Sequence, residues 1–213
     1  MTKPLTVYVY NGIGNSNCYL QFVSKLFDLV NVKYVDNLSF LSKKEHNPSD
    51  IIYFGGGRGQ HVMDNLPLYQ INELKQNVSN NQIRYIGVCC GAYLAGKSIV
   101  FDGTKKKTFG LCNALSVGPY YKKGFNGYNY SVDNSIVLSN YLIYDDRKVN
   151  VYLNGGGWFS NIPKDYAIVS YYENSSLPSI IMNKQILLSH VHIEHPATNK
   201  IFYTLVSSFI FDR

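Results

Sequence analysis

The sequence has few cysteines, few charged residues and no long apolar run, and each shortage excludes a class of protein. Four cysteines among 213 residues are too few for a disulfide scaffold, and no pair has the Cys-x-x-Cys spacing of a zinc site. No run approaches the roughly 18 apolar residues of a membrane span, and the first residues lack the apolar core of a secretory signal. We therefore expect a cytoplasmic protein with reduced cysteines and no membrane partner.

The remaining composition is that of an ordinary globular domain. Hydrophobic residues make up 46% of the chain and charged residues 16%, which excludes fibrous and intrinsically disordered classes. No linker, repeat or low-complexity stretch divides the chain, so we predict one domain over residues 1–213. The net charge of +6 permits an acidic partner without requiring one.

Strands and helices alternate in the first half of the chain. Apolar runs predict strands at Leu5–Tyr10, Val32–Val35, Ile51–Phe54 and Ile83–Val88. Apolar residues at helical spacing predict helices over 19–30 and 71–78, the second capped by Asn65 with Pro67 in its first turn, and Cys89–Ala95 favours a third. Strands that are apolar throughout and separated by helices predict an open, mostly parallel α/β sheet with helices on both faces.

The second half changes to short β-prone stretches separated by Gly, Asn and Ser. These predicted strands are Ser98–Phe101, Ser135–Leu138, Val149–Leu153, Ala167–Tyr172 and Ile186–Leu188. We expect them to form an antiparallel extension of the sheet. After Pro196, apolar residues at helical spacing predict a C-terminal helix that docks through Phe202, Leu205, Val206 and Phe209.

The strongest chemical signal is Gly-x-Cys-x-Gly over Gly87–Gly91, at a predicted junction between a strand and a helix. A nucleophile elbow needs glycine two places before and after the nucleophile, because a Cβ at either place clashes in the sharp turn. The following helix N-terminus favours a thiolate at Cys89, and the backbone N–H of Cys90 is available to an oxyanion. The alternative is a buried cysteine pair that only fills space under the turn.

A base for this cysteine is present after the last predicted strand. His192 and Glu194 form a His-x-Glu pair, in which the imidazole takes the thiol proton and the carboxylate orients the ring. Two alternatives remain open. His190, His192 and His195 have the residue type of a zinc site, with 190 and 192 on one face of a strand, or they are surface histidines before a helix.

Two Gly-rich turns and two lysine clusters complete the candidates. Gly55–Gln60 exposes backbone N–H groups suited to an oxyanion or a phosphate, and Asn154–Phe159 carries Trp158, which would line a pocket or the core. Alternatively, the glycines of either turn only allow the chain to change direction. Lys105–Lys107 and Lys122–Lys123, the latter beside Tyr120 and Tyr121, suit single-stranded nucleic acid, but solvated loops are the commoner outcome and we do not expect a nucleic-acid partner.

Five motifs in order resemble one family, the N-terminal domain of eukaryotic-type biotin-protein ligases, which also occurs as a free-standing protein. They are Val9–Gly14, Tyr53–Gly57, Gly87–Tyr93, Tyr152–Phe159 and His192–Glu194. That domain is similar to class I glutamine amidotransferases, so the resemblance implies a flavodoxin-like sheet and a Cys-His-Glu triad. Ile193 stands where amidotransferases have proline, and Gly55 stands where the strand-three motif begins with proline.

The resemblance assigns roles residue by residue. It implies Cys89 as nucleophile, His192 as base and Glu194 as the orienting carboxylate, with the N–H groups of Gly57 and Cys90 as oxyanion hole. The residues expected to line the substrate pocket are Gly56, Arg58, Tyr93, Asn154, Gly155, Gly156 and Trp158.

The predicted function is therefore that of a hydrolase or acyl (amido) transferase acting on a small-molecule or peptide amide or ester, without metal or cofactor. A separate partner chain would be needed to receive ammonia. The alternative is a non-catalytic module that binds a ligand or a protein on the same fold.

Overall fold

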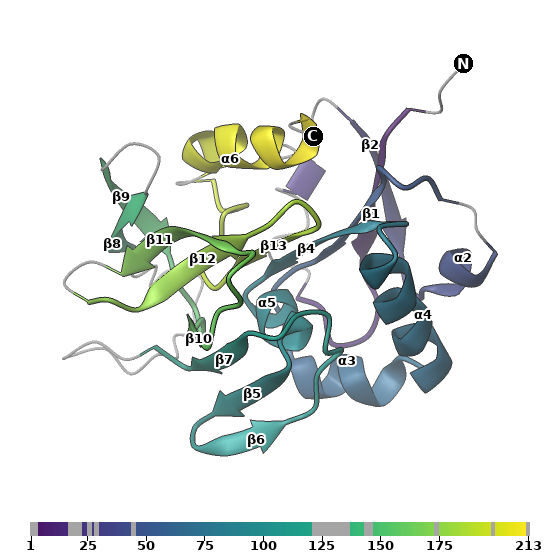
Figure 1. Ribbon diagram of the computed structural model, residues 1–213, viewed down its shortest axis with the longest axis horizontal. Helices are drawn as coiled ribbons and strands as arrows, with labels where there is room; N and C mark the ends of the chain where they lie inside the picture. Colours follow the sequence, from purple (N-terminus) through teal and green to yellow (C-terminus); the bar gives the residue numbers. More distant parts are fainter. Residues whose placement is uncertain are drawn as a thin grey trace.

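The computed structural model describes residues 4–16, 23–24, 27, 30–43, 46–120, 137–142, 147–172, 175–196 and 199–211. The helix predicted over 19–30 and the cluster Lys122–Lys123 fall largely or wholly outside these ranges. The described elements form a nine-stranded sheet, a smaller four-stranded sheet and helices on both faces of the larger one (Figure 1).

Five parallel strands make up one half of the large sheet, in the order β2-β1-β3-β4-β13. Their bounds are β1 Thr6–Tyr10, β2 Asn31–Val35, β3 Ile51–Phe54, β4 Arg84–Val88 and β13 Ile186–Ser189. Four of these strands, β1, β3, β4 and β13, are buried along their whole length, as expected for a parallel sheet covered on both faces. The predicted α/β fold is confirmed.

Alternate side chains of each parallel strand enter two separate cores. Val7, Ile51 and Ile86 face a core that includes Phe202 and Val206 of α6 (Asn199–Phe211). Their neighbours Tyr8 and Tyr85 face the opposite core. That core also contains residues of four helices, α2 (Ser39–Ser42), α3 (Gly59–Asn65), α4 (Leu68–Ser79) and α5 (Cys90–Ala95). The C-terminal helix docks through the four predicted apolar residues, all of which are buried.

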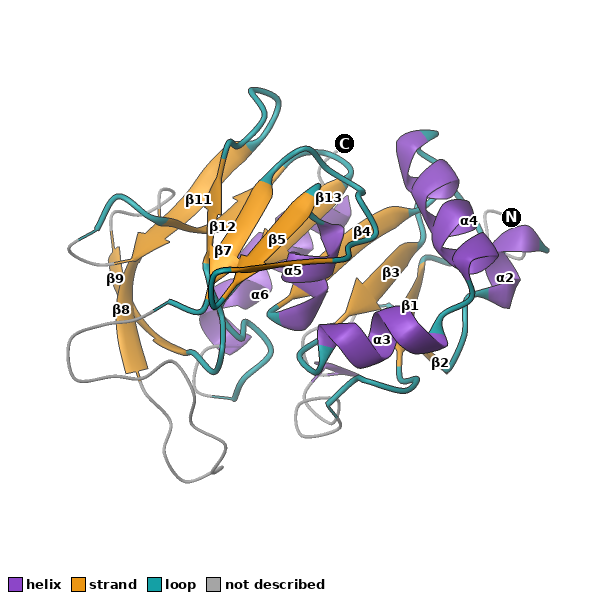
Figure 2. Ribbon diagram, turned by 90° about the horizontal axis from the view of Figure 1, so that it is seen from below, coloured by secondary structure: helices purple, strands orange, loops and turns teal. Residues whose placement is uncertain are grey.

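Four antiparallel strands continue the sheet beyond β13, in the order β12-β11-β8-β9, as Figure 2 shows. They are β8 Val137–Leu142, β9 Arg147–Tyr152, β11 Ala167–Tyr172 and β12 Pro178–Met182. The predicted antiparallel extension is therefore present. Two of its predicted members lie elsewhere. Ile186–Leu188 belongs to β13, which pairs in parallel with β4 at the centre of the sheet. Ser98–Phe101 belongs to the small sheet.

The small sheet has the order β10-β7-β5-β6. Its strands are β5 Ser98–Phe101, β6 Thr104–Lys106, β7 Leu115–Gly118 and β10 Trp158–Ser160. The sequence did not predict this separate sheet. Its strands β5 and β7 contact α5, the helix that follows β4.

One helix boundary differs from the prediction. A short helix, α3 (Gly59–Asn65), begins inside the Gly-rich turn, and Asn65 is its last residue, where the Asn65 side chain donates to the His61 carbonyl. The next helix, α4, is capped by Pro67 instead. Only Val62 of α3 is buried, so this helix carries no apolar periodicity that would reveal it.

Candidate active site

Cys89 sits between the last residue of β4 and the first residue of α5, in a backbone conformation that few non-glycine residues adopt. Its φ is +51°. Such a residue persists only where its surroundings hold it, and these strained residues gather at functional sites. The strained position places the Cys89 side chain at the carboxyl edge of the parallel sheet.

The two glycines of the motif are required by close contacts in the backbone. A Cβ on Gly87 would lie 2.6 Å from the Gly91 carbonyl oxygen, and a Cβ on Gly91 would overlap the Phe54 carbonyl oxygen. The Gly91 N–H also donates to the Gly55 carbonyl over 3.1 Å. The turn therefore packs against the end of β3 more closely than any side chain would allow.

His192 and Glu194 follow β13, the strand next to β4. The register pairs Ser189 with Val88, so the residues after these two parallel strands meet at the same sheet edge. His192 Nδ1 lies 2.9 Å from Glu194 Oε1, and both side chains are buried. The His192 N–H donates to the Tyr152 carbonyl over 3.0 Å, which fixes the loop that carries the imidazole.

The surroundings of His192 favour its charged form. Burial lowers its pKa, but the Glu194 carboxylate, followed by the negative charge of Cys89 and hydrogen bonds with both residues, outweighs burial and holds the pKa well above the usual value. Glu194 and Cys89 also act on Tyr53: burial, then the charges of these two residues, raise the pKa of the Tyr53 hydroxyl. The imidazole of His192 thus interacts with two acidic groups, Glu194 and Cys89.

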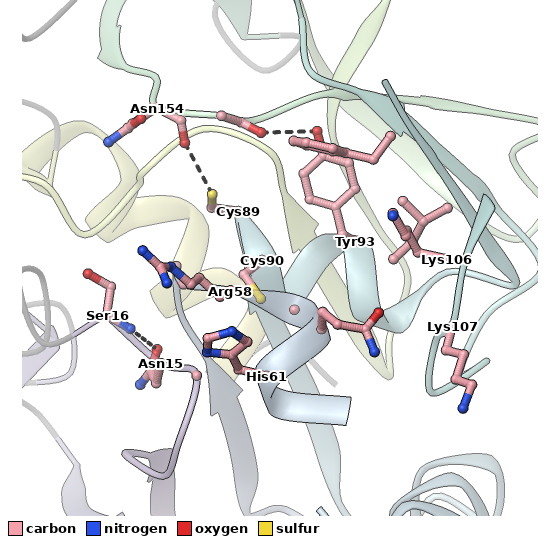
Figure 3. A pocket seen from close by; sticks show the side chains of 18 of the residues that line it. Asn15, Ser16, Arg58, His61, Cys89, Cys90, Tyr93, Lys106, Lys107 and Asn154 are labelled. Carbon is pink, nitrogen blue, oxygen red and sulfur yellow. Dashed lines mark hydrogen bonds between the residues drawn. The ribbon is translucent and has the colours of Figure 1, made fainter. Parts of the chain in front are cut away.

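Two hydrogen bonds join the nucleophile elbow to the Gly-rich turn at Asn154–Gly155. The Cys89 Sγ atom donates to the Asn154 carbonyl over 3.4 Å, and the Tyr93 hydroxyl donates to the Gly155 carbonyl over 3.1 Å (Figure 3). The turn that follows β9 therefore lies directly over the nucleophile elbow.

Neither the Gly57 N–H nor the Cys90 N–H donates a hydrogen bond to the backbone of another described residue. Gly57 has a φ of +151°, and a Cβ there would overlap the Gly14 carbonyl oxygen, so glycine is needed at this close approach. On either side, Ser16 N–H donates to the Gly56 carbonyl and Arg58 N–H donates to the Gly14 carbonyl. These bonds hold the turn while the Gly57 N–H remains available.

A pocket of about 740 Å³ opens at this edge of the sheet. Cys89, Cys90, His192 and Gly57 line it, together with five of the seven residues predicted for the pocket: Gly56, Arg58, Tyr93, Asn154 and Gly155. Figure 3 labels Cys89, Cys90, Arg58, Tyr93 and Asn154 among the lining residues.

Gly156 and Trp158 are not part of this lining. A Cβ on Gly156 would overlap the His190 carbonyl oxygen, so that glycine packs inside the protein. Trp158 is partly buried against the core, with its ring 6.5 Å from the Tyr120 ring. Glu194 lies behind His192 and does not reach the pocket surface.

The three histidines considered as a zinc site do not converge. The His190 ring packs between Tyr93 and Phe159, at centroid distances of 4.5 and 4.2 Å, and the His195 ring stacks on Tyr152 at 4.4 Å. Among the described residues, no group of three His, Cys, Asp or Glu side chains has an arrangement that could hold a metal ion. The surface alternative is also wrong for His190 and His192, which are fully buried.

Several lining residues escaped the sequence analysis. Asn15 and Ser16 line the pocket from the turn after β1, and Phe101, Lys106 and Lys107 line it from the β5–β6 hairpin. The signal for Lys106 and Lys107 is the lysine run, which the sequence analysis interprets as a solvated loop or a nucleic-acid site and not as part of a pocket. In the part of the chain that is described, no helix is long and apolar enough to cross a membrane.

Solved structures with a similar fold include proteins described as glutamine amidotransferases. A crystal structure described as a glutamine amidotransferase superposes with a TM-score of 0.63 at 15% identity, covering 94% of this chain and 98% of that chain. A protein from Thermoplasma acidophilum described as a putative subunit of GMP synthase gives 0.62 at 13% identity, covering 99% of this chain and 94% of the other. PurLQS from Thermotoga maritima gives 0.57 at 12% identity, covering 96% and 99%.

These identities establish the fold alone, which is that of the glutamine amidotransferases. The family model described as biotin-protein ligase, N-terminal, matches residues 5–200, and the chain therefore belongs to that family. No curated protein matches the sequence.

Proposed function

We propose that this protein is a cysteine-nucleophile hydrolase or acyl transferase that acts on an amide or ester, with Cys89 as nucleophile, His192 as base and Glu194 as the residue that orients His192. The observation that carries the proposal is the strained Cys89 elbow beside a buried His192–Glu194 pair at 2.9 Å, opening into a pocket. A nucleophile, a base and a group that orients the base are the parts such chemistry needs.

The reaction follows from these positions. His192 takes the Cys89 proton, and the resulting imidazolium is stabilised by Glu194. The sulfur then bonds to the carbonyl carbon, and the developing oxyanion accepts from the N–H groups of Gly57 and Cys90. The bond from carbon to nitrogen or oxygen breaks as His192 protonates the leaving group. Water or an acceptor amine then attacks the thioester, passes its proton to His192, and restores the Cys89 thiol.

One contact favours a second candidate, a non-catalytic module that binds a ligand or a protein. The Cys89 thiol donates to the Asn154 carbonyl over 3.4 Å, so a contact within the protein already occupies the sulfur. A protein partner fits either candidate, since one structure of the same fold is described as belonging to a synthase of more than one chain.

Iodoacetamide labelling separates the two candidates without a known substrate. The rate at each cysteine is followed by peptide mass spectrometry between about pH 6 and pH 9. Cys90 and Cys112 are internal references, because burial, together with the neighbouring Cys89 charge in the case of Cys90, raises the pKa of both thiols. The enzyme proposal expects Cys89 to react at least about tenfold faster than either near pH 7.

Three variants give this assay its specificity. His192→Gln should slow the labelling of Cys89 by about tenfold or more near pH 7, because the cation beside the sulfur is lost. Glu194→Gln should slow it less, since it lowers the His192 pKa but keeps the ring. The matched control is His195→Gln, whose imidazole stacks on Tyr152 and should leave the rate unchanged. Equal rates at Cys89 in the protein and in its His192→Gln variant would favour the binding module.

A further inference from the structure

We propose that the pocket selects an acyl substrate that carries a negative charge, such as a carboxylate or phosphate, and no positive charge near it. This inference rests on the proposed function and names the substrate class of the same site. The charges of the pocket lining carry it.

All the Lys, Arg, Asp and Glu side chains among the described residues that line the pocket are positively charged. Arg58, Lys106 and Lys107 line it, and no Asp or Glu among the described residues does so. Each of the three is exposed, and none forms an ion pair with a described carboxylate. Their charges are therefore available to a ligand.

The two lysines come from a different part of the fold than the arginine. Arg58 caps the N-terminus of α3, in the turn that also contains Gly57. Lys106 and Lys107 lie at the end of β6, and Figure 3 shows them across the pocket, beyond Tyr93. Positive charges from two elements of the fold therefore line the pocket.

The pairing within the hairpin accounts for three of the side chains that line the pocket, those of Ile99, Phe101 and Lys106. Ile99 pairs with Lys106, and both line the pocket together with Phe101. Lys105 pairs with Val100, and neither lines it. Because alternate residues of a strand face opposite sides, the hairpin presents an apolar wall with a lysine at its end. Such a wall suits an aliphatic or aromatic acyl group that ends in an anion.

The same charges disfavour ligands that carry an ammonium group. Glutamine is a zwitterion, and its ammonium group has no carboxylate partner among the described lining residues. Like charges in a partly enclosed site repel more strongly than in open water. The pocket is therefore suited to an anionic amide or ester in preference to glutamine.

The test compares two alkylating reagents of nearly equal size, iodoacetate and iodoacetamide, on Cys89. Both replace iodide at the same carbon, and they differ by one negative charge. The quantity measured is the ratio of the iodoacetate rate to the iodoacetamide rate, divided by the same ratio for N-acetylcysteine. With roughly two- to threefold attraction for each of three cations, we expect a normalised ratio of about ten at low salt. The ratio should fall toward one in about 0.5 M salt.

Charge-removing variants locate the effect. The double variant Lys106→Gln/Lys107→Gln should lower the normalised ratio about fivefold, and Arg58→Gln about two- to threefold. The matched control is Lys184→Gln, which lowers the net charge by the same amount as Arg58→Gln. It lies before β13, at the sheet edge opposite Cys89, and does not line the pocket, so the ratio should not change.

Two results would overturn the inference: a normalised ratio near one, or a ratio that Lys184→Gln lowers as much as the pocket variants do. The second would assign the effect to net charge. Because both reagents attack the same sulfur, the ratio does not depend on how reactive Cys89 is. A slow iodoacetamide reaction would contradict the proposed function, whereas only the ratio bears on the substrate class.

Discussion

His190 is a buried histidine whose replacement by phenylalanine should remove a defined part of the acid sensitivity of the fold. Its ring is fully buried between Tyr93 and Phe159, and neither ring nitrogen has a hydrogen-bond partner among the described residues. Burial lowers the pKa of His190 from 6.5 to about 3. Protonation of this ring therefore favours the unfolded chain.

The expected magnitude follows from the difference between the two pKa values. With a folded value near 3 and an unfolded value of 6.5, the His190 contribution is complete above pH 6.5 and is lost as pH falls from there toward 3. Each pH unit within that window costs about 1.4 kcal/mol, so about 2 kcal/mol is lost between pH 7.5 and pH 5. A phenylalanine ring cannot take up the proton, so His190→Phe should not show this loss.

Urea unfolding at several pH values measures the effect. The free energy of unfolding of the parent should fall about 2 kcal/mol more than that of His190→Phe between pH 7.5 and pH 5. Any constant cost of the larger ring appears at both pH values and cancels. His61, which is exposed, supplies the control His61→Gln, which should retain the parent's loss. Parallel curves for the parent and His190→Phe would refute the reasoning.

Two further substitutions test the site and the docked helix. Gly56→Ala places a Cβ 2.9 Å from Cε1 of His192, so it should displace the imidazole. We expect iodoacetamide to label Cys89 several-fold more slowly, with little change in the urea midpoint. An unchanged labelling rate would contradict this contact. Arg84→Met removes the donors to the carbonyls of Phe209 and Ile210, at 2.6 and 3.0 Å. Urea unfolding should then show a free energy of unfolding lower by about 2–4 kcal/mol. A decrease below about 0.5 kcal/mol would contradict the role of Arg84 at this helix end.

The parallel half of the sheet was predictable because burial on both faces leaves a direct trace in the sequence. Ile51–Phe54 is apolar throughout and ends at glycine, and the structure forms β3 over the same residues. The elbow at Cys89 was predictable for a similar reason, since a turn this close to the Phe54 carbonyl requires glycine at position 91. In both cases the local sequence carries the physical constraint.

The misplaced elements lacked such a local trace. Ile186–Leu188 has the same apolar pattern whether it pairs in parallel or antiparallel, and its partner β4 lies about 100 residues earlier in the chain. Trp158 lies in β10, which pairs with β7, and the glycines beside it in the sequence do not reveal this pairing. Lys106 enters the pocket through its pairing with Ile99, which the lysine run alone does not reveal.

The most direct test of the central claim is to trap the acyl group on the nucleophile. The protein is mixed with p-nitrophenyl acetate, the release of nitrophenolate is followed in the first seconds, and the acetylated peptide is identified by mass spectrometry. The account predicts a rapid burst of about one equivalent and a thioester on Cys89, absent in Cys89→Ser and slowed in His192→Gln. No burst, or an acetyl group on Cys90 or a lysine with Cys89 unmodified, would contradict it.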